Sequence, residues 1–400
     1  MAAPASVRAE DPQRVSTIKS RMKILLISNY LPDQQQSMLR YAAMLQRECN
    51  RRGWQAEIIH PLAIVGGFSW LRGSLKKWLG YVDKYLFAPG YLWSHARHAD
   101  LVHICDHSNA MYLRCAGTRP ALITCHDLLA VFTARGAYPQ MKTGATGRIL
   151  QRWIAASISQ AKFIICVSTK TQQDLKRLDP EMDAYTEVIY HSLNWPYAPA
   201  PPEAIAEARK NSALNPNGEY LLHVGGNQWY KNRLGTMQIF AALQRYPRFQ
   251  NVKLIMAGKP WTSEMRQYSE SQGLTEKIIE RNSVANEELQ ALYSGSMALV
   301  FPSVEEGFGW PLLEAQACGC PVITSARAPM TEVAGDGALF IDPADPEAAA
   351  RTIADYADKL PALRVAGTSN LARFDADIMM NRYISFYLWT IEEKSHSGSE

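Results

Sequence analysis

Short apolar runs alternate with longer amphipathic segments along this chain, and this alternation limits the possible folds more than any other feature. It is the pattern of parallel βαβ units, so it predicts an α/β fold. The pattern occurs as two separate series. The predicted strands are residues 23–28, 55–60, 100–105, 120–125, 162–167 and 186–190 in the first series, and residues 219–225, 252–257, 277–281, 297–301, 321–324 and 338–341 in the second.

The chain between and around the two series predicts the domain boundaries. Four hundred residues exceed what one core usually supports, so we expect two Rossmann-like domains, with ligands at the carboxyl ends of their strands. The predicted parts are a polar, disordered extension at 1–21 without the features of a secretory signal, a first domain at 22–195, a proline-rich linker at 196–218, a second domain at 219–374, and a crossover helix with its tail at 375–400. Met22, directly before the first predicted strand, is a candidate start of the chain.

Composition places the chain among ordinary globular proteins of a reducing compartment. The apolar fraction is 47% and the charged fraction 20%. No apolar run approaches the roughly 18 residues that span a bilayer. Seven cysteines, an odd number, lie mostly in apolar runs, which favours buried free thiols and a cytoplasmic location. Cys318 and Cys320 lack a second pair or a suitably spaced histidine, so we expect them to pack rather than to bind metal.

Two glutamates bracket a glycine-containing loop that leads into a helix. In the segment Glu306-Gly-Phe-Gly-Trp-Pro-Leu-Leu-Glu314, Pro311 suits the first helical position. Free N–H groups at Leu312 and Leu313, with the positive end of the helix dipole, would bind a diphosphate. Carboxylates accept pairs of hydroxyl hydrogen bonds, so Glu306 and Glu314 suit the diols of a ribose and a hexose. For either glutamate alone, a helix-start preference at Glu314 or a solvated loop charge at Glu306 is the more ordinary explanation.

The segment resembles the signature of a known family. With Gly-Phe-Gly between the acids and Glu-Ala-Gln-Ala-Cys-Gly-Cys-Pro-Val-Ile after them, it is similar to the retaining family 4 glycosyltransferases, the glycosyl transferases group 1. This resemblance implies a GT-B fold, in which two Rossmann-like domains face one another across a cleft and a C-terminal helix crosses back to the first domain. The donor-binding residues that it implies are Gly225, Gly226, Lys231, Glu306, Gly307, Phe308, Gly309, Leu312, Leu313 and Glu314.

The loop after the first strand of the second series matches the diphosphate loop of that family. Gly225 and Gly226 allow close backbone approach, and Lys231 would neutralise the leaving diphosphate. By itself, a Gly-Gly pair before a helix is more often only a turn. The family usually carries Arg directly before this Lys, whereas Tyr230 stands here. Arg233 follows two residues after Lys231, a spacing that gives it little geometric support as a replacement.

His126 is the first-domain residue that the resemblance assigns to the reacting centre. It ends a predicted strand in Thr-Cys-His-Asp-Leu and matches the His-Asp motif, where the histidine hydrogen-bonds the donor sugar. A structural histidine is the alternative. Asp127 is expected to cap the next segment. The predicted catalytic residues are therefore His126, Glu306 and Lys231.

Polar residues after another first-domain strand are candidates for acceptor contacts. These are Asp106, His107, Ser108 and Asn109, although helix capping explains Asp106 or Ser108 equally well. The loop Pro32–Ser37 departs from the glycine pair that many relatives carry there, which removes support for a phosphate contact from this loop. Asp375-Ala-Asp377 has the spelling of a metal motif but opens the last predicted helix, Arg373 to Glu393, so we assign it no metal.

Charge is distributed unevenly between the two halves. Residues 1–200 contain 24 Lys and Arg against 14 Asp and Glu, and residues 201–400 contain 18 against 24. Within the basic half, Trp70 to Arg97 interleaves lysines with aromatic residues, as a helix at an anionic membrane surface would. The same stretch also fits an ordinary core stripe formed by Leu71, Leu75, Leu79, Val82 and Leu86. Nucleic acid is not an expected partner, because no recognised binding module accompanies the charge.

Together these features predict a retaining glycosyltransferase, cytoplasmic or peripheral at the inner face of the membrane. Its expected partners are a UDP- or GDP-sugar donor and a glycan or lipid-linked acceptor in cell-surface polysaccharide synthesis, without a metal or other cofactor. A nucleotide-sugar epimerase of the same architecture and a catalytically silent interaction protein are the alternatives, the second supported only by Tyr230. A nicotinamide dehydrogenase is disfavoured, because no Gly-x-Gly-x-x-Gly follows either first strand.

Overall fold

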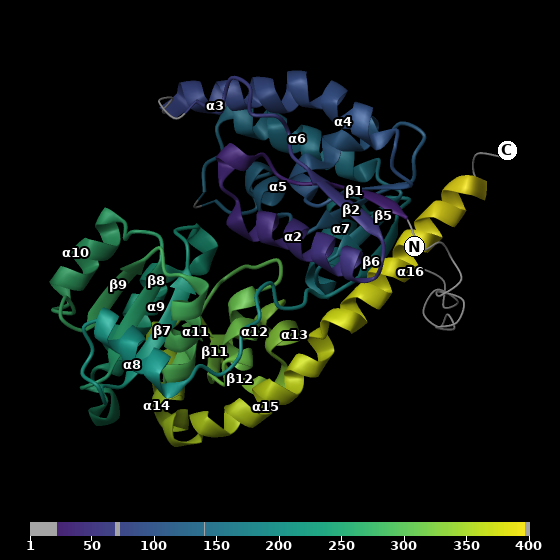
Figure 1. The fold of residues 1–400 in the computed structure, drawn as a ribbon. Helices are drawn as coiled ribbons and strands as arrows, with labels where there is room; N and C mark the ends of the chain where they lie inside the picture. The colour runs from purple at the N-terminus through teal and green to yellow at the C-terminus, as the bar shows by residue number, and fades with distance from the viewer. Residues whose placement is uncertain (1–21, 69–72, 140, 397–400) are drawn as a thin grey trace. The chain divides into compact units, whose positions relative to one another are not determined.

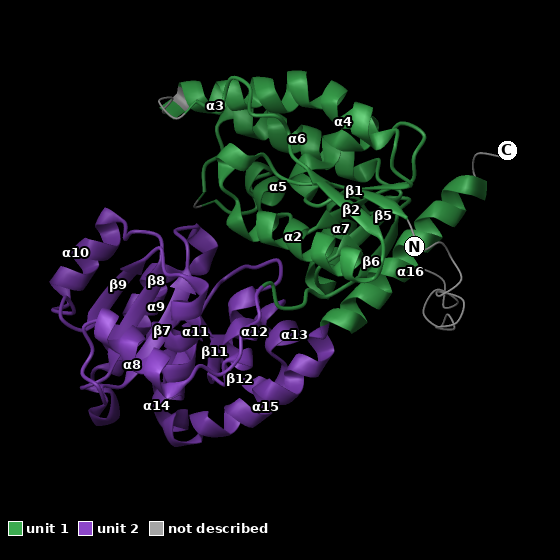
Figure 2. Ribbon diagram, in the orientation of Figure 1, with its two compact units in different colours: residues 1–194, 376–400 green, residues 195–375 purple. Residues whose placement is uncertain are grey.

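The computed structural model describes residues 22–68, 73–139 and 141–396, which divide into two compact units (Figures 1 and 2). Unit 1 comprises residues 1–194 and 376–400, and unit 2 comprises residues 195–375. The extension expected at 1–21, Trp70 and Leu71 of the amphipathic stretch, and the last four residues of the tail lie outside the described residues. Each unit is described by itself.

Unit 1 contains a six-stranded parallel sheet in the order β2-β1-β3-β4-β5-β6. Because the strands are short and apolar, residues such as Val102, Ile123 and Ile164 are fully buried in the core beneath the covering helices. The strands are β1 (Lys23–Ile27), β2 (Gln55–Ile59), β3 (Leu101–Ile104), β4 (Ala121–Cys125), β5 (Phe163–Cys166) and β6 (Tyr185–Val188).

The helices of unit 1 connect these strands and cover the sheet (Figure 1). They are α2 (Gln36–Arg51), α3 (Gly73–Val82), α4 (Ala88–Ala96), α5 (Leu129–Ala134), α6 (Ala145–Ser159), α7 (Thr169–Leu178) and α16 (Ala376–His396). A π-helical turn at Asp83–Phe87 joins α3 to α4, and 3₁₀ segments lie at Leu31–Asp33 and His107–Ala116.

Unit 2 contains a second six-stranded parallel sheet, in the order β12-β11-β10-β7-β8-β9. β7 lies between β10 and β8, so loops from distant parts of the chain meet at its carboxyl end. The strands are β7 (Tyr220–Gly225), β8 (Lys253–Gly258), β9 (Ile278–Asn282), β10 (Ala298–Phe301), β11 (Val322–Ser325) and β12 (Ala338–Ile341).

The helices of unit 2 alternate with its strands, apart from α8, which precedes β7 and packs against α11. They are α8 (Pro202–Asn211), α9 (Arg233–Leu243), α10 (Ser263–Ser271), α11 (Asn286–Gly295), α12 (Trp310–Ala317), α13 (Met330–Ala334), α14 (Pro346–Tyr356) and α15 (Leu363–Asn370). Short 3₁₀ segments lie at Trp229–Lys231, Pro247–Phe249, Gly335–Gly337, Ala357–Ala362 and Leu371–Phe374.

All twelve predicted strands are present, each with ends within two residues of those predicted. The last helix differs more. It was expected from Arg373 but begins at Ala376, because Leu371–Phe374 forms a separate 3₁₀ turn and Asp375 has an extended backbone with φ −61° and ψ 139°.

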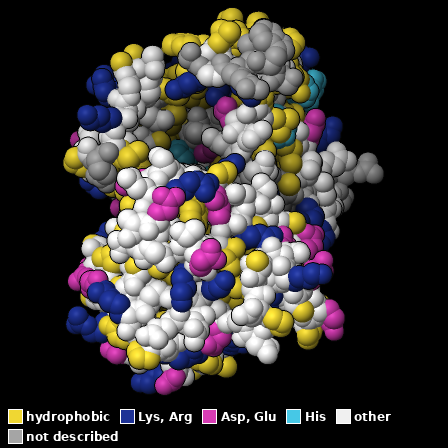
Figure 3. All heavy atoms as spheres, turned by 90° about the vertical axis from the view of Figure 1, so that its left-hand side faces the viewer, with side chains coloured by type: hydrophobic (Ala, Val, Ile, Leu, Met, Phe, Trp, Pro, Cys, Tyr) yellow, Lys and Arg dark blue, Asp and Glu magenta, His cyan; other side chains and the backbone are white. Residues whose placement is uncertain are grey.

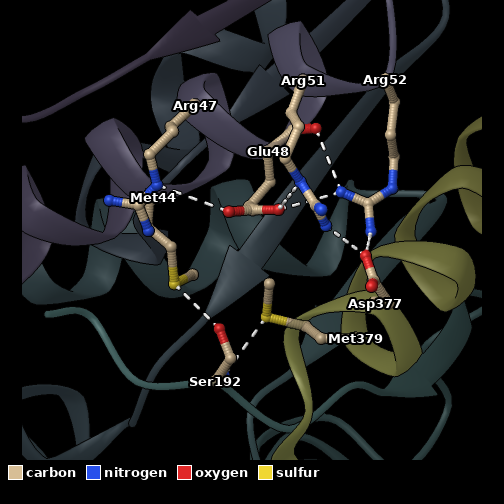
Figure 4. A network of polar contacts seen from close by, with 8 residues as sticks. All are labelled: Met44, Arg47, Glu48, Arg51, Arg52, Ser192, Asp377 and Met379. Carbon is tan, nitrogen blue, oxygen red and sulfur yellow. Dashed lines mark hydrogen bonds and ion pairs between the residues drawn. The ribbon is translucent and has the colours of Figure 1, made fainter. Parts of the chain in front are cut away.

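A network of ion pairs and hydrogen bonds joins α16 to α2 within unit 1 (Figure 4). Arg51, the last residue of α2, and Arg52, which follows it, both pair with Asp377, and both also contact the buried Glu48, at 3.1 and 2.9 Å. Below this network the N–H and hydroxyl of Ser192 contact two methionine sulfurs, one from each helix. Asp377, the second aspartate of the Asp375-Ala-Asp377 sequence, is therefore paired with two arginines.

Buried tyrosines also attach α16 to unit 1. The hydroxyls of Tyr383 and Tyr41 are 2.7 Å apart, and the Tyr387 hydroxyl lies 2.7 Å from Nδ1 of His103 on β3. All of these side chains are buried, so α16 contributes to the core of unit 1.

The amphipathic stretch around α3 and α4 exposes apolar side chains. Leu75 is 56% exposed, Trp78 55% and Leu86 69%. The alternative that Leu75 and Leu86 belong to an ordinary core stripe is therefore wrong, because the core contacts of this stretch come from other residues, including Leu92 and Tyr85. None of the helices in the described ranges is both long and apolar enough to cross a membrane. All seven cysteines are buried and free.

Candidate functional site

In unit 2, the loops after the neighbouring strands β7 and β10 bring Lys231 and Glu306 together. The Lys231 Nζ donates to Glu306 Oε1 at 2.7 Å, and the two side chains are 17% and 7% exposed. The pair therefore joins two of the predicted catalytic residues, 75 positions apart in sequence, at the carboxyl end of the sheet.

Local backbone geometry fixes this pair. The 3₁₀ turn Trp229–Lys231 ends at Asn232, whose backbone is left-handed with φ 52°, a conformation that asparagine tolerates better than most residues. The Asn232 side chain donates to the Pro302 carbonyl at 3.1 Å, and the Val304 N–H donates to the Tyr230 carbonyl at 2.8 Å. Both contacts tie the β7 loop to the β10 loop.

The Lys231 ammonium lies over two aromatic rings and keeps unused donors. Its Nζ is 5.3 Å from the ring centre of Phe301 and 5.5 Å from that of Tyr230. An ammonium has three N–H groups, and only the contact with Glu306 uses one of them among the described residues. Two donors are left for an anion, and Tyr230, directly before Lys231, contributes a ring rather than a charge.

The helix that follows the glycine loop begins as predicted but offers fewer donors than expected. Gly309 precedes α12 with φ 104°, a conformation open to glycine, and Pro311 is the second helical residue. The Leu312 N–H donates to the Gly309 carbonyl at 3.0 Å. The expectation of a free N–H at Leu312 is therefore wrong, because the first turn of α12 closes on itself. The side chains of Leu312 and Leu313 are fully buried.

Glu314 is buried and already has a protein partner. The Tyr293 hydroxyl donates to Glu314 Oε2 at 2.9 Å, and burial, followed by the neighbouring Glu314 charge, raises the pKa of Tyr293 well above its ordinary value. Phe308 is also buried, with its ring 6.0 Å from that of Phe374. Of the two predicted carboxylates, Glu306 thus lies beside a cation and Glu314 beside a phenol.

Two of the predicted glycines allow close packing at the end of β7. A Cβ on Gly225 would lie 3.2 Å from His223 Nε2, and one on Gly226 would lie 2.5 Å from the flexible Gln228 side chain. Across the sheet, Gly258 has φ 149°, and a Cβ there would lie 1.9 Å from the Gly225 carbonyl oxygen. The ends of β7 and β8 therefore require glycine at position 258.

His223 of β7 is a neutral histidine beneath this loop. Its Nδ1 donates to the Val300 carbonyl at 2.9 Å, which leaves Nε2 as an acceptor without a partner among the described residues. Burial, together with the charges of Arg233 and Lys231, lowers the pKa of His223 to about 3, and the hydrogen bond to Val300 opposes this shift. The end of β7 is thus a region of positive potential.

In unit 1, His126 follows β4 in a buried cluster of rings. Its Nε2 donates to the Cys105 carbonyl at 2.9 Å, and its Nδ1 lies 3.3 Å from Nε2 of His191, whose ring stacks on it at 5.2 Å. Burial lowers the pKa of His126, so the imidazole is neutral at pH 7. Both ring nitrogens have protein partners. Asp127 accepts from the Leu129 N–H at 3.0 Å, as expected of a cap.

The predicted acceptor residues lie at the carboxyl end of β3. Asp106 caps the following 3₁₀ segment by accepting from the N–H and hydroxyl of Ser108, and also accepts from Asn29 at 2.5 Å. Burial works to raise the Asp106 pKa, but the neighbouring His107 and His126 and these hydrogen bonds hold it below its ordinary value. His107 Nδ1 lies 3.1 Å from the same carboxylate.

Sequence reasoning missed two residues beside this group. Ser28 and Asn29 follow β1, which neighbours β3, and both are buried. Ser28 Oγ, Asn29 Oδ1 and Asn109 Nδ2 have no hydrogen-bond partner in the described part of the chain. Ser28 is the last residue of the predicted strand 23–28 and Asn29 follows it, as His126 follows the predicted strand 120–125, and this position was the available signal.

Comparison with known proteins matches both halves of the chain. The family model described as Glycosyltransferase Family 4 matches residues 38–194, and the model described as Glycosyl transferases group 1 matches residues 204–364. An O-antigen chain mannosyltransferase B of Escherichia coli is 29% identical over 231 residues, which are 57% of this chain and 58% of that protein. The matched part of the chain thus spans just over half the length of this curated relative.

Solved structures resemble the whole chain. A sucrose-phosphate synthase from Thermosynechococcus elongatus has a TM-score of 0.70 at 20% identity, with 94% of this chain and 100% of that chain covered. Anabaena HepE, solved in complex with UDP and glucose, has a TM-score of 0.67 at 18% identity, with 90% and 97% covered. At these identities the similarity concerns the fold. The chain belongs to glycosyltransferase family 4, the glycosyl transferases group 1, and has the GT-B fold.

Proposed function

We propose that this protein is a retaining glycosyltransferase that moves a hexose from a nucleotide diphosphate sugar to a glycan or lipid-linked acceptor. The observation that carries the proposal is the Lys231–Glu306 pair, held at the carboxyl end of the unit 2 sheet with two ammonium donors unused by the described part of the chain. A preorganised cation in a mostly buried position stabilises charge that develops during a reaction. A diphosphate leaving group develops such charge.

In this proposal Lys231 binds the departing diphosphate, and Glu306 holds the ammonium in place. Glu306 Oε1 accepts from Lys231, while the carboxylate as a whole has lone pairs for a sugar hydroxyl. No side chain is assigned as a nucleophile, so the acceptor attacks from the face that the diphosphate leaves. A phosphate oxygen takes the proton of the acceptor hydroxyl.

The proposed reaction uses no metal ion. Lys231 takes the role that a divalent cation has in other sugar transferases, and Asp377 is occupied by Arg51 and Arg52. The part of the chain that the structure describes contains no group of three or more His, Cys, Asp and Glu suited to a metal.

The other predicted site residues keep their proposed roles in donor binding, but some of their hydrogen-bonding groups already have protein partners. His126 is neutral and can donate to a donor-sugar oxygen only by exchanging its contact with Cys105 or His191. Glu314 can accept from a ribose hydroxyl while it also accepts from Tyr293. Gly225, Gly226, Gly307 and Gly309 contribute backbone.

The proposed acceptor site lies at the ends of β1 and β3 in unit 1. The unpartnered atoms of Ser28, Asn29 and Asn109 comprise donors and acceptors, which suit the hydroxyls of a sugar. Since the E. coli relative is an O-antigen chain mannosyltransferase, mannose and a cell-surface polysaccharide are the first sugar and product to test.

An anionic membrane surface is the proposed location of a lipid-linked acceptor. The exposed Leu75, Trp78 and Leu86 lie in the same stretch as Lys76 and Lys77, and apolar and basic side chains lie together on the upper part of the face shown in Figure 3. Such a combination binds the interface of anionic bilayers. Sedimentation with vesicles of anionic lipid, but not with neutral vesicles, would support a peripheral cytoplasmic protein.

A donor panel tests the proposed function. UDP- and GDP-sugars, with GDP-mannose first, are scored by the shift of the melting midpoint, because ligand binding to the native state raises it. Transfer to an acceptor must follow for a donor that binds. A donor converted to an epimer in the absence of an acceptor would identify an epimerase, and the absence of a shift with every donor would contradict the proposal.

A further inference from the structure

Arg233 is a buried arginine whose donors are only partly used. It opens α9 and is 4% exposed. Its Nη1 donates to the Lys259 carbonyl at 2.8 Å and to Asn227 Oδ1. Its Nε and Nη2 have no hydrogen-bond partner among the described residues.

This guanidinium also lacks a counterion. Within residues 22–68, 73–139 and 141–396, no carboxylate lies within ion-pairing distance of Arg233. Burial lowers the pKa of Arg233, and the Glu280 charge opposes this from further away. A buried charge without a partner is unfavourable, so a buried guanidinium with two unpartnered donors favours the binding of an anion. The groups left over, Nε–H and Nη2–H, are side by side in the guanidinium fork and suit two oxygens of one phosphate.

A cavity borders this side chain. Its volume is about 200 Å³, and it is lined by Arg233, Asn227, Trp229, Thr262 and Glu264 among others. Two helices begin beside it, α9 at Arg233 and α10 after its cap Thr262, so two positive helix ends accompany the guanidinium. Glu264, the acid in this lining, is exposed on the first turn of α10. The cavity is smaller than the 300–1,000 Å³ typical of whole-ligand sites, which suits one group of a larger ligand.

We propose that Arg233 binds a phosphoryl group of the nucleotide diphosphate donor, as a second cation beside Lys231. The proposal rests on the proposed function. Lys231 ends the 3₁₀ turn that follows β7, and Arg233 opens α9 two residues later, so both follow the carboxyl end of this strand. Tyr230, directly before Lys231, carries no charge, and Arg233 supplies a guanidinium two residues after Lys231, at the cavity that Thr262 and Glu264 also line.

The test compares nucleotide affinity in three variants of the full chain. Arg233→Met removes the charge and the fork, Arg233→Lys keeps a point charge, and Arg245→Met removes an exposed arginine of unit 2 that pairs with Glu347. Calorimetry measures UDP, GDP, the two nucleosides and inorganic phosphate. We expect Arg233→Met to weaken the nucleoside diphosphate that wild type binds by at least tenfold, about 1.4 kcal/mol. Nucleoside affinity stays unchanged, Arg233→Lys is intermediate, and Arg245→Met matches wild type.

Stability without ligand separates binding from a structural role. Because the guanidinium is buried without a counterion, Arg233→Met should melt at or above the wild-type midpoint, whereas a structural arginine would lower it. If Arg233→Met does not fold, the comparison of Arg233→Lys with wild type decides, since a lysine cannot reproduce the fork.

Three outcomes would overturn the inference. One is unchanged diphosphate affinity in folded Arg233→Met. Another is an equal loss of nucleoside affinity, which indicates a disturbed fold. The third is that inorganic phosphate affinity depends on Arg233 whereas nucleoside diphosphate affinity does not. This result would indicate a separate anion site. If wild type binds no nucleoside diphosphate, the proposed function itself fails; if wild type binds and Arg233→Met binds equally, only this inference fails.

Discussion

Replacing Lys231 by Met tests the pair on which the proposed site depends. The variant keeps an apolar stem of similar length but leaves the Glu306 carboxylate, 7% exposed, without its counterion. Removing one partner of a buried pair costs about 3–5 kcal/mol. Because Lys231 retains 17% exposure, we expect a loss near the lower end, about 3 kcal/mol, including the contacts with the Phe301 and Tyr230 rings.

A double variant separates stability from binding. In Lys231→Met with Glu306→Gln no buried charge is left unpaired, so most of the lost stability should return. Nucleoside diphosphate affinity should stay at least tenfold below wild type in both variants, a difference of about 1.4 kcal/mol, because the ammonium is missing in both. Denaturant unfolding measures the first quantity, and calorimetry with UDP and GDP measures the second.

The matched control is Lys170→Met in unit 1. Lys170 and Asp174 form a pair of the same length, 2.7 Å, with 16% and 14% exposure. This control should lose stability and keep nucleotide affinity. The reasoning is refuted if Lys231→Met binds the nucleotide like wild type, or if the double variant regains affinity together with stability.

Three further outcomes follow from the same contacts. Glu314→Gln retains an acceptor for the Tyr293 hydroxyl but removes the charge, so donor affinity should fall by about 1.5–3 kcal/mol with a melting midpoint near wild type; unchanged affinity would exclude a ribose contact. Transfer should survive EDTA, and loss of turnover restored by manganese or magnesium would contradict the metal-free reaction. His223, with its pKa lowered to about 3, is neutral in the folded state, so the unfolded chain takes up the proton first as pH falls below about 6.5. Stability should therefore be complete above that pH and decline by up to about 1.4 kcal/mol per pH unit below it, and urea unfolding at pH 7 and pH 5 should show a smaller decline for His223→Gln than for wild type.

The strands and their order of appearance could be predicted because each is a short apolar run buried by helices. Such a run carries its own signal, independent of its neighbours. The predicted start of the last helix was less accurate, because a 3₁₀ turn precedes the helix where helix was expected. Leu371–Phe374 has helix-compatible residues, yet it forms a 3₁₀ turn, and the helical pattern alone does not distinguish the two.

The sequence predicted those site residues that lie in recognisable local motifs, but it did not predict their contacts. Lys231 and Glu306 lie in recognisable loops, but their contact depends on β7 and β10 being neighbours in the sheet. Tyr293, which occupies one oxygen of Glu314, lies on α11 and carries no motif. Likewise, the Leu312 N–H is lost to a backbone carbonyl three residues earlier, a detail of turn geometry that composition does not encode.

The net charge of the second half of the chain does not indicate the local charge at its proposed site. For this reason the sequence alone gives little sign of a role for Arg233. Residues 201–400 contain more acids than bases, 24 against 18, whereas Lys231 and Arg233 both follow β7, and among the described residues the carboxylate of Glu306 pairs with Lys231 alone of these two. Most acids of this half lie on the exposed surface, where water and salt screen them. Buried charges are screened far less, so a small number of desolvated cations decides what binds. Nucleotide affinity should consequently fall less with added salt than the proposed association of unit 1 with anionic vesicles, which would depend on Lys76 and Lys77 of α3.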